Sequence, residues 1–561
     1  MSCSLARTPT TGVLGIVADA KAANIRLLRS VTSSYFSMRS RPGQGLAARG
    51  EFDHPDAPWH NGRMDAQAGT MLDGLDDAQR QAASSIEGPV RIIACAGAGK
   101  TRTITRRIAY GVASGTWDPT RVLAVTFSVK AAGEMRDRLD ALQVPRGMRI
   151  ATFHSAALRQ CREAWRAICS GPFPDLIADA KRKREVVAAG VFRATARQPE
   201  PQEVADIERE IDWCKVSLIA PQDYDKVCAA THREPPAGCD PGRFARIYGE
   251  YEAEKTARMG IDYNDILLLA SHICDADDEV GHALRSQVGW LTVDEYQDVS
   301  PLQHRLMRAW LGENRNVCVV GDPAQTIYSF AGATSYYLAS FGREFAPLGA
   351  DIALRTDYRS LPPIVARANH VLSRSPQRGD YVRLEPAREG TTRVTSAIYG
   401  TDEEEAEAVA RRIERVIARG GKAGDCAVLT RLTRQQPCIV QALKAHGIPY
   451  QVRRDAGWQS SPLVPPPNAS AVDSLEALQA GRVTVSTIHA SKGLEFPHVY
   501  LVGLSDGILP YQGMVSPDHL EEERRLLYVG ITRAEDTLHL SYARKQDDQS
   551  PAVRSLSRFL A

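Results

Sequence analysis

Short apolar runs recur along the chain and predict buried strands. Residues 90–93 (VRII), 290–293 (WLTV) and 317–320 (VCVV) are rich in β-branched or other apolar side chains. Each run stops abruptly, the first and third near glycines and the second at the carboxylates of Asp294 and Glu295. Runs of this length that end at turn-forming or charged residues are typical of strands inside a sheet.

Helical spacing of apolar residues follows the strands. Ile104, Ile108 and Val112 fall on one face of a helix after the first strand. A second helix is predicted over 402–419, with acids in its first turn, arginines toward its end and Gly420 after it. Its apolar stripe consists of Ala406, Val409, Ile413, Val416 and Ile417. Strands that alternate with helices predict an α/β fold with a doubly wound core.

The segment between the first strand and its helix has the composition of a phosphate-binding loop. Small residues let backbone N–H groups close around phosphates, and the helix N-terminus adds a favourable dipole. Lys100 would reach the β and γ phosphates, and the Thr101 hydroxyl could ligate magnesium. This segment alone indicates only a nucleotide triphosphatase. The predicted nucleotide contacts here are Ala94, Cys95, Ala96, Gly97, Ala98, Gly99, Lys100, Thr101 and Arg102.

Cys95 leaves two interpretations open. A thiol near a helix N-terminus and Lys100 could have a lowered pKa and be reactive. Alternatively, Cys95 is a buried, inert small residue of the loop.

Acidic and amide side chains follow the other two strands. Asp294 can hold magnesium through water, and Glu295 can orient and deprotonate the attacking water. Gln325, in the segment Gly321 to Gln325, is an uncharged amide suited to sensing a γ-phosphate. The predicted metal ligands are therefore Thr101 and Asp294.

The length of the chain sets the expected number of domains, and its composition excludes several classes of protein. The 561 residues correspond to about three to five domain-sized units. Hydrophobic residues make up 43% and charged residues 24% of the chain, which is an ordinary soluble composition. No stretch approaches the length of uninterrupted apolar sequence that a transmembrane helix needs, so no membrane partner is expected. Sixty-nine Lys and Arg balance 67 Asp and Glu, which excludes a histone-like coat but allows a basic groove for nucleic acid.

The eleven cysteines are scattered and form no C-x-x-C pair. Reduced thiols and a cytoplasmic location, associated with the nucleoid in a bacterium, are the simplest expectation. The first 70 residues are rich in arginine, serine and glycine, and we expect a disordered extension or an upstream start codon. A transit peptide is the alternative, and Met64 and Met71 are alternative starts.

Nine segments, taken in order, resemble the motifs of superfamily 1A DNA helicases, the UvrD/Rep/PcrA family. The resemblance covers about 72 to 561. The segments, from the Q motif and motif I through Ia, Ib and II to VI, are 75–82 (LDDAQRQA), 94–101 (ACAGAGKT), 126–135 (TFSVKAAGEM), 152–155 (TFHS), 293–298 (VDEYQD), 320–333 (VGDPAQTIYSFAGA), 357–360 (DYRS), 487–496 (TIHASKGLEF) and 528–534 (YVGITRA).

The resemblance implies roles for individual residues. Gln79 would bind the adenine edge, Tyr358 would stack on its face, and Glu495 would bond the ribose. Around the γ-phosphate, the implied residues are Lys100, Gln325, Arg359 and Arg533, which with Asp294 and Glu295 make up the catalytic set. An arginine supplied in cis is worth about 10³–10⁵ in rate. If Arg359 and Arg533 belong to a second domain, ATP binding and hydrolysis would drive relative domain motion.

The resemblance also implies a DNA-binding surface. Single strands are held by aromatic stacking and backbone charge. The matching positions are Phe127, His154, Tyr328, Phe330 and His489. Phe330 stands where the family usually has tryptophan, and phenylalanine stacks over less area.

The implied architecture is two RecA-like P-loop NTPase motor domains with a helical insertion, 1B. Domain 1A would comprise 71–155 and 262–350, separated by 1B at 156–261, and domain 2A would comprise 351–453 and 482–561. The family normally inserts a large helical subdomain, 2B, before motif V. Here only 454–481 is available, 28 residues with a Pro-Pro-Pro run, which predicts a short linker instead.

These features predict an ATP-dependent 3′–5′ helicase and translocase on single-stranded DNA, acting in DNA repair, recombination or replication restart. Single-stranded and tailed duplex DNA are the expected substrates, and a protein partner could supply duplex contact. One alternative is a helicase-like scaffold without turnover, which would be free to lose the catalytic residues. The other alternative is a translocase that strips proteins from DNA but unwinds weakly, because the 2B subdomain is missing.

Overall fold

The computed structural model describes residues 68–169, 171–454, 457–460, 481–512 and 516–561. The predicted N-terminal extension and most of the predicted linker at 454–481 therefore lie outside the described residues. The chain forms two compact units. The first contains 68–91, 101–320 and 328–351, and the second contains 92–100, 321–327 and 352–561.

A six-stranded sheet carries the phosphate-loop strand next to its edge. The strand order is β3-β2-β6-β7-β1-β8, and the pairs β2–β3, β2–β6 and β6–β7 are parallel. In chain order the bounds are β1 (Val90–Ala94), β2 (Val122–Thr126), β3 (Arg149–Thr152), β6 (Trp290–Val293), β7 (Val317–Gly321) and β8 (Ala350–Leu354). The strands predicted at 90–93, 290–293 and 317–320 are confirmed, and a parallel sheet brings their carboxyl ends to one edge.

Helices connect these strands. They are α4 (Asp77–Ser84), α5 (Lys100–Ala113), α6 (Val129–Ala141), α7 (Phe153–Ile168), α12 (Tyr263–Asp275), α13 (Glu279–Ser286), α14 (Pro301–Leu311) and α15 (Tyr336–Glu344). The predicted apolar face of α5 is confirmed, because Ile104, Ile108 and Val112 are all buried. At the start of α7 the Thr152 hydroxyl accepts a hydrogen bond from the Ser155 N–H, which caps the helix.

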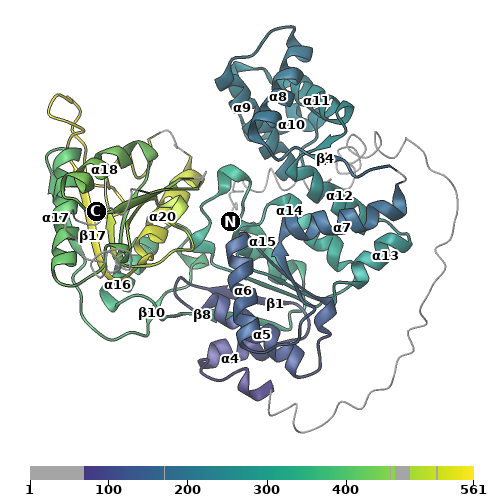
Figure 1. Ribbon diagram of the computed structural model, residues 1–561, viewed down its shortest axis with the longest axis horizontal. Helices are drawn as coiled ribbons and strands as arrows, with labels where there is room; N and C mark the ends of the chain where they lie inside the picture. Colours follow the sequence, from purple (N-terminus) through teal and green to yellow (C-terminus); the bar gives the residue numbers. More distant parts are fainter. Residues whose placement is uncertain (1–67, 170, 455–456, 461–480, 513–515) are drawn as a thin grey trace, which may run out of the picture. The chain divides into compact units, whose positions relative to one another are not determined.

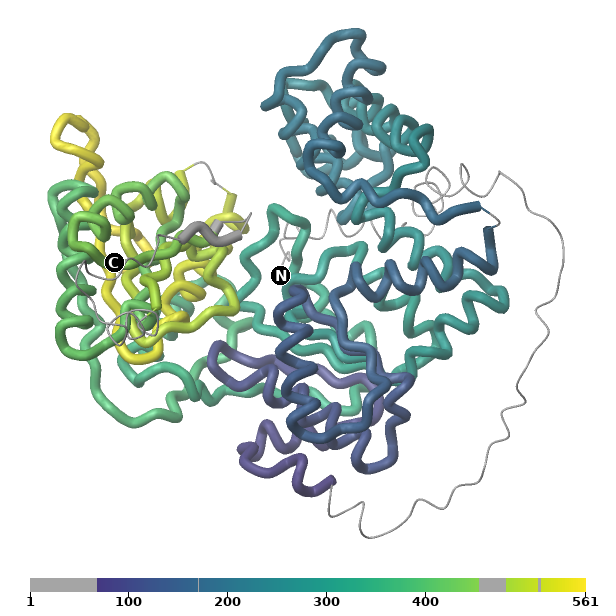
Figure 2. The backbone as a smooth tube through the Cα atoms, in the orientation of Figure 1, coloured from purple at the N-terminus to yellow at the C-terminus, as the bar shows by residue number. Residues whose placement is uncertain are grey.

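Figure 1 shows a group of helices between α7 and α12. This group has its own hydrophobic core. The chain leaves α7, runs through this group and returns into α12, a path that Figure 2 traces. Its helices are α8 (Ala180–Thr195), α9 (Pro201–Val216), α10 (Tyr224–Thr231) and α11 (Pro241–Ala257). Two short parallel strands, β4 (Asp175–Leu176) and β5 (Gly260–Ile261), pair where the group begins and ends. Fully buried side chains such as Val187, Ile211, Phe244 and Tyr248 fill the core.

The second unit is built on a seven-stranded sheet of order β11-β17-β16-β12-β15-β13-β14. Its pairs are parallel except β13–β14, which is antiparallel. The strands are β11 (Thr395–Tyr399), β12 (Cys426–Thr430), β13 (Tyr450–Arg454), β14 (Gly457–Ser460), β15 (Val483–Thr487), β16 (Phe496–Leu501) and β17 (Ala534–Ala543). The helices are α16 (Pro362–Ser373), α17 (Asp402–Ala418), α18 (Gln436–Ala445) and α20 (Pro517–Ile531).

The helix predicted over 402–419 is α17, which ends one residue earlier than expected. Its apolar stripe packs on the sheet, with Ala406, Val409 and Ile413 buried and Val416 and Ile417 partly buried beside them. Within the described residues, no helix is both long and apolar enough to cross a membrane. The ten cysteines that the structure describes are all free thiols.

Candidate nucleotide and DNA sites

The phosphate loop connects β1 to α5 in a backbone conformation that requires glycine. Gly97 and Gly99 both have φ of +72°, in the left-handed region that favours glycine. A side chain at Gly97 would also collide with a carboxylate, because its Cβ would lie 1.9 Å from Asp357 Oδ1. The Ala96 N–H donates to the Tyr528 hydroxyl at 3.4 Å. The loop is therefore closely packed, and its backbone conformation requires glycine at both positions.

The segment after β8 packs directly on this loop. The Tyr358 N–H donates to the Gly97 carbonyl at 3.0 Å, and the Tyr358 ring remains 44% exposed. The Asp357 carboxylate accepts from the N–H groups of Arg359 and Ser360 at 2.7 and 3.2 Å, and burial raises its pKa. An exposed ring fixed by its backbone beside a phosphate loop can stack on a nucleotide base.

Two predicted nucleotide-binding residues form an ion pair with each other. The Arg359 guanidinium lies 2.5 Å from the Glu495 carboxylate and donates to the Thr532 carbonyl at 3.1 Å. Arg359 is mostly buried and Glu495 is mostly exposed. A phosphate that binds Arg359 would compete with the Glu495 carboxylate for the same guanidinium.

Arg533 differs from Arg359 because its guanidinium bonds backbone carbonyls and a hydroxyl within the protein. It is 2% exposed, and its guanidinium donates to the carbonyls of Val529 and Leu494, both at 3.0 Å, and to the Thr532 hydroxyl. These bonds join α20 to the segment before β16.

Gln325 belongs to a buried polar cluster that the sequence did not predict. Its amide donates to Asp322 at 2.8 Å, and the Tyr528 hydroxyl donates to the same carboxylate at 3.4 Å. Lys492 donates to the Gln325 carbonyl at 2.7 Å. Asp322, Tyr528 and Lys492 all lie inside motif-like segments, but only their contacts reveal that they position Gln325. The cluster also reaches the phosphate loop, because Tyr528 accepts from Ala96.

The acidic loop after β6 is described within the first unit. Asp294 is buried, its N–H donates to the Val125 carbonyl, and its carboxylate accepts from the Glu295 N–H at 2.9 Å. Glu295 has φ of +53°, a conformation that costs a non-glycine residue about 1–3 kcal/mol. Gln297 donates to the Glu295 carboxylate at 2.5 Å and orients it. Strain of this kind is typical of a residue that a functional site holds in one orientation.

The remaining predicted nucleotide contacts lie on helices of the first unit. Gln79 is buried and forms a capping box with Asp76 at the start of α4, accepting from the Asp76 N–H at 3.3 Å. Arg102 donates to the Gly74 carbonyl at 2.7 Å, which ties α5 to the segment before α4. Thr101 lies in the first turn of α5, directly after Lys100.

Aromatic side chains are exposed where the sequence predicts DNA contacts. Phe330 is 64% exposed and Phe127 is 39% exposed, although both are large and apolar. The rings of Tyr328 and Phe330 lie 6.0 Å apart in an edge-to-face arrangement. Exposed rings of this kind are costly to leave in water and are suited to stacking on bases.

The two predicted DNA-contacting histidines are uncharged near neutral pH. Burial lowers the pKa of His154, and burial with the nearby charges of Arg431 and Lys492 lowers that of His489 to about 3. They can therefore contribute hydrogen bonds to a DNA backbone but no positive charge.

Comparison with known proteins identifies the family of this chain. The sequence profile of the UvrD/REP helicase N-terminal domain matches residues 75–346, and that of the UvrD-like helicase C-terminal domain matches 352–457 and 469–545. This chain belongs to the UvrD/Rep family of ATP-dependent DNA helicases. The two matched domains agree with the expected α/β fold of two RecA-like motor domains.

Curated relatives match along most of their length. The ATP-dependent DNA helicase UvrD2 of Mycobacterium tuberculosis is 36% identical over 584 positions, covering 89% of this chain and 82% of the relative. PcrA of Bacillus subtilis is 24% identical, covering 84% and 83%. Rep of Salmonella typhimurium is 26% identical, covering 87% and 93%.

In this UvrD/Rep family member the structure favours one of the two interpretations of Cys95, the buried and inert residue. Burial, together with the charges of Asp322 and Asp357, raises the pKa of the thiol well above its usual value, and Lys100 opposes this only in part. The Cys95 thiol donates to the Arg355 carbonyl at 3.3 Å. The alternative interpretation, a buried inert residue, fits these contacts.

We expect alkylating reagents to leave Cys95 unmodified at neutral pH, because the thiolate is the nucleophile and burial suppresses it. Peptide mass mapping after treatment of the folded protein would measure this. The same mapping on urea-unfolded protein is the control, in which Cys95 should react. Modification of Cys95 in the folded protein at the unfolded rate would contradict the assignment.

Phe330→Ala should weaken stimulation of ATP hydrolysis by single-stranded DNA, since loss of one stacked base costs about 1–3 kcal/mol. Phe330 follows Gln325 by five residues, so one short segment connects the proposed phosphate sensor to the ring. The measurement is the DNA concentration that gives half-maximal ATPase stimulation. A Phe330→Trp variant should retain or improve the response. Equal losses in the Ala and Trp variants would indicate a packing role for this position.

Proposed function

We propose that this family member moves 3′ to 5′ along single-stranded DNA and separates strands, in DNA repair, recombination or replication restart. The observation that supports this proposal is that the chain contains every side chain to which we assign a role in hydrolysis, together with exposed aromatic rings. A non-hydrolytic scaffold would need neither the strained, oriented Glu295 carboxylate nor the Arg359 guanidinium.

We also propose which side chains bind the phosphates, the metal ion, the nucleoside and DNA. Lys100, Gln325, Arg359 and Arg533 would bind the γ-phosphate, and Glu295 would accept the proton of the attacking water. Thr101 and Asp294 would hold Mg²⁺, since a hydroxyl and a buried carboxylate are hard oxygen donors of the kind it prefers. Bound Mg²⁺ would supply charge neutralisation of the phosphate oxygens. Gln79, Tyr358 and Glu495 would bind the nucleoside, and Phe127, His154, Tyr328, Phe330 and His489 would bind DNA.

The polarity is tested by strand separation on matched substrates. We expect the protein to unwind a duplex with a 3′ single-stranded tail and to leave the same duplex with a 5′ tail intact. A blunt duplex of the same sequence is the control for tail-independent entry. Preference for the 5′ tail would contradict the proposed direction.

A specific observation favours the second candidate function, a translocase that strips proteins and unwinds weakly alone. The segment 454–481, where the family inserts subdomain 2B, has only 28 residues. The alignment with Rep runs over 652 positions although 87% of this 561-residue chain takes part, so the relative has many residues with no counterpart here. Fewer phosphate contacts would lower the affinity for the duplex, so unwinding would be short in range and would be lost at a lower salt concentration.

Single-turnover unwinding of short and long 3′-tailed duplexes separates the two candidates. Weak unwinding of the long duplex, with normal displacement of a protein bound to single-stranded DNA, would favour the translocase. A protein partner that supplies duplex contact would then restore the long duplex reaction. Robust unwinding of the long duplex at physiological salt would show that the chain needs neither subdomain 2B nor a partner.

A further inference from the structure

Helix α7 presents a row of arginines to solvent beyond the proposed DNA contact at His154. Arg159, Arg162 and Arg166 are all exposed, and their spacing of three, four and seven residues puts them on one face. We name these three residues the α7 arginine row. The opposite face of α7 is buried and mostly apolar.

The row borders a shallow depression in the surface. It is lined by Ser155, Leu158, Arg159, Arg162, Glu163 and Arg166. Glu163 is the single acid among these lining residues, and its carboxylate lies 3.6 Å from Arg159 in a half-exposed pair that contributes little. The Arg162 guanidinium lies 5.8 Å from the centre of the Phe173 ring, a cation–π contact that restricts its motion. The depression therefore carries net positive charge and suits a polyanion.

An exposed ring lies at the His154 end of α7. Tyr263, the first residue of α12, is 48% exposed, and its ring is 5.9 Å from that of His154 at nearly a right angle. Helix α12 packs on the buried face of α7, where the Cys161 thiol donates to the Ile266 carbonyl at 3.6 Å. Tyr263 is thus held beside a residue of the proposed DNA site.

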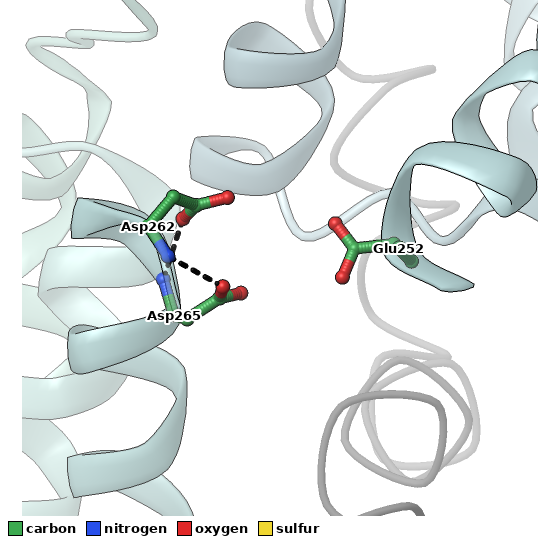
Figure 3. A group of neighbouring side chains, drawn as sticks. All are labelled: Glu252, Asp262 and Asp265. Atoms are coloured by element: carbon green, nitrogen blue, oxygen red, sulfur yellow. Dashed lines mark hydrogen bonds between the residues drawn. The ribbon is translucent and has the colours of Figure 1, made fainter. Parts of the chain in front are cut away.

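A buried ion network fixes the start of α12, and Figure 3 shows its carboxylates. Asp262 and Asp265 form a capping box, each accepting from the backbone N–H of the other at 2.9 Å. Lys255 lies 3.0 Å from Asp262 and 2.5 Å from Asp265, and Lys215 bonds Asp262, Asp265 and Glu252. The two ammonium groups satisfy the carboxylates that could otherwise hold a metal ion. The network thereby gives Tyr263 a rigid base.

We propose that Tyr263 and the α7 arginine row extend the single-stranded DNA site, with a base stacked on Tyr263 and phosphates held by the arginines. This inference rests on the proposed function, since it adds to the DNA surface that contains His154. At 1.5 Å per residue the row covers about 10 Å, which corresponds to about three nucleotides of a stacked strand. Continuity with His154 and charge complementarity identify the occupant as the DNA backbone.

The test of the row is DNA affinity over a series of salt concentrations. We expect an Arg159→Gln, Arg162→Gln, Arg166→Gln triple variant to bind a long oligo-dT at least about tenfold more weakly at low salt. The slope of log affinity against log salt should fall by about 2, since each phosphate contact to a single strand contributes about 0.7. Fluorescence anisotropy with labelled oligo-dT measures both quantities.

A matched control removes the same charge elsewhere. Arg411, Arg415 and Arg419 are exposed at four-residue spacing on or just after α17, where glutamates accompany them. Their triple replacement by Gln should leave the affinity and the salt slope at wild-type values. Thermal melting checks the fold of each variant. If the α7 triple variant does not fold, Arg166→Gln alone should lower the slope by about 0.7.

Tyr263 is tested by Tyr263→Ala and Tyr263→Phe. The Ala variant should bind oligo-dT about tenfold more weakly, while the Phe variant retains the stacking surface and binds as the wild type does. Wild-type affinity and slope in both the α7 triple and Tyr263→Ala variants would overturn the inference while leaving the proposed function intact. Failure of the wild-type protein to bind oligo-dT would overturn the proposed function itself.

Discussion

Arg359→Ala should lower kcat for ATP hydrolysis by about 10³-fold or more, the effect expected when an arginine that stabilises phosphoryl transfer is removed. Arg359 is the guanidinium best placed for this role, because an exposed carboxylate and one carbonyl are its partners. Arg533 is less suited to the same test. Its bonds to Val529 and Leu494 hold the second unit together, so its loss would also destabilise the fold.

Glu495→Gln is the matched control for Arg359→Ala, because it removes the same ion pair from the other side. We expect Glu495→Gln to change the KM for ATP more than kcat, as suits a ribose contact. Steady-state kinetics over a range of ATP concentrations separates the two parameters. If both variants lost kcat equally, Arg359 would matter only as the partner of Glu495.

Glu295→Gln should bind ATP but hydrolyse it at least about 10²-fold more slowly, the usual size of a general-base contribution. The amide has nearly the shape of the carboxylate, and its oxygen can still accept from Gln297, so the local structure should persist. Single-turnover hydrolysis and nucleotide binding by fluorescence measure the two steps. Glu279→Gln, the same exchange at an exposed position of α13, controls for the loss of one charge. Near-normal hydrolysis by Glu295→Gln would remove Glu295 from the mechanism.

The elements that sequence reasoning predicted well are those with strong local signals. The strand at 290–293 matches β6 because an apolar run meets a pair of carboxylates, and both signals lie within a few residues. Helix α17 has its acids, its arginines and its apolar stripe all in one segment, so its bounds were predictable to one residue.

Features that depend on distant segments could not be predicted in this way. The interpretation of Cys95 as a thiol with a lowered pKa rested on the neighbouring Lys100 and the helix N-terminus. Burial and the charges of Asp322 and Asp357, which come from distant segments, raise the pKa instead. The left-handed backbone of Glu295 has no signal in the sequence, because a glutamate at that position does not favour it. The pairing of Arg359 with Glu495 likewise joins residues more than a hundred positions apart.

The same limit applies to the surface of α7. Its arginines are visible in the sequence, but a charged helix face is usually only solvated. The edge-to-face contact of His154 with Tyr263, and the buried lysines beneath α12, give that face a functional interpretation.

The central claim, that this chain couples ATP hydrolysis to movement on single-stranded DNA, is tested most directly by its steady-state ATPase rate with and without oligo-dT. The wild-type rate should rise strongly with oligo-dT and saturate, and the Glu295→Gln variant, measured beside it, should stay near zero in both conditions. A wild-type ATPase rate that does not respond to oligo-dT would contradict this claim. So would a Glu295→Gln variant that hydrolyses ATP at the wild-type rate.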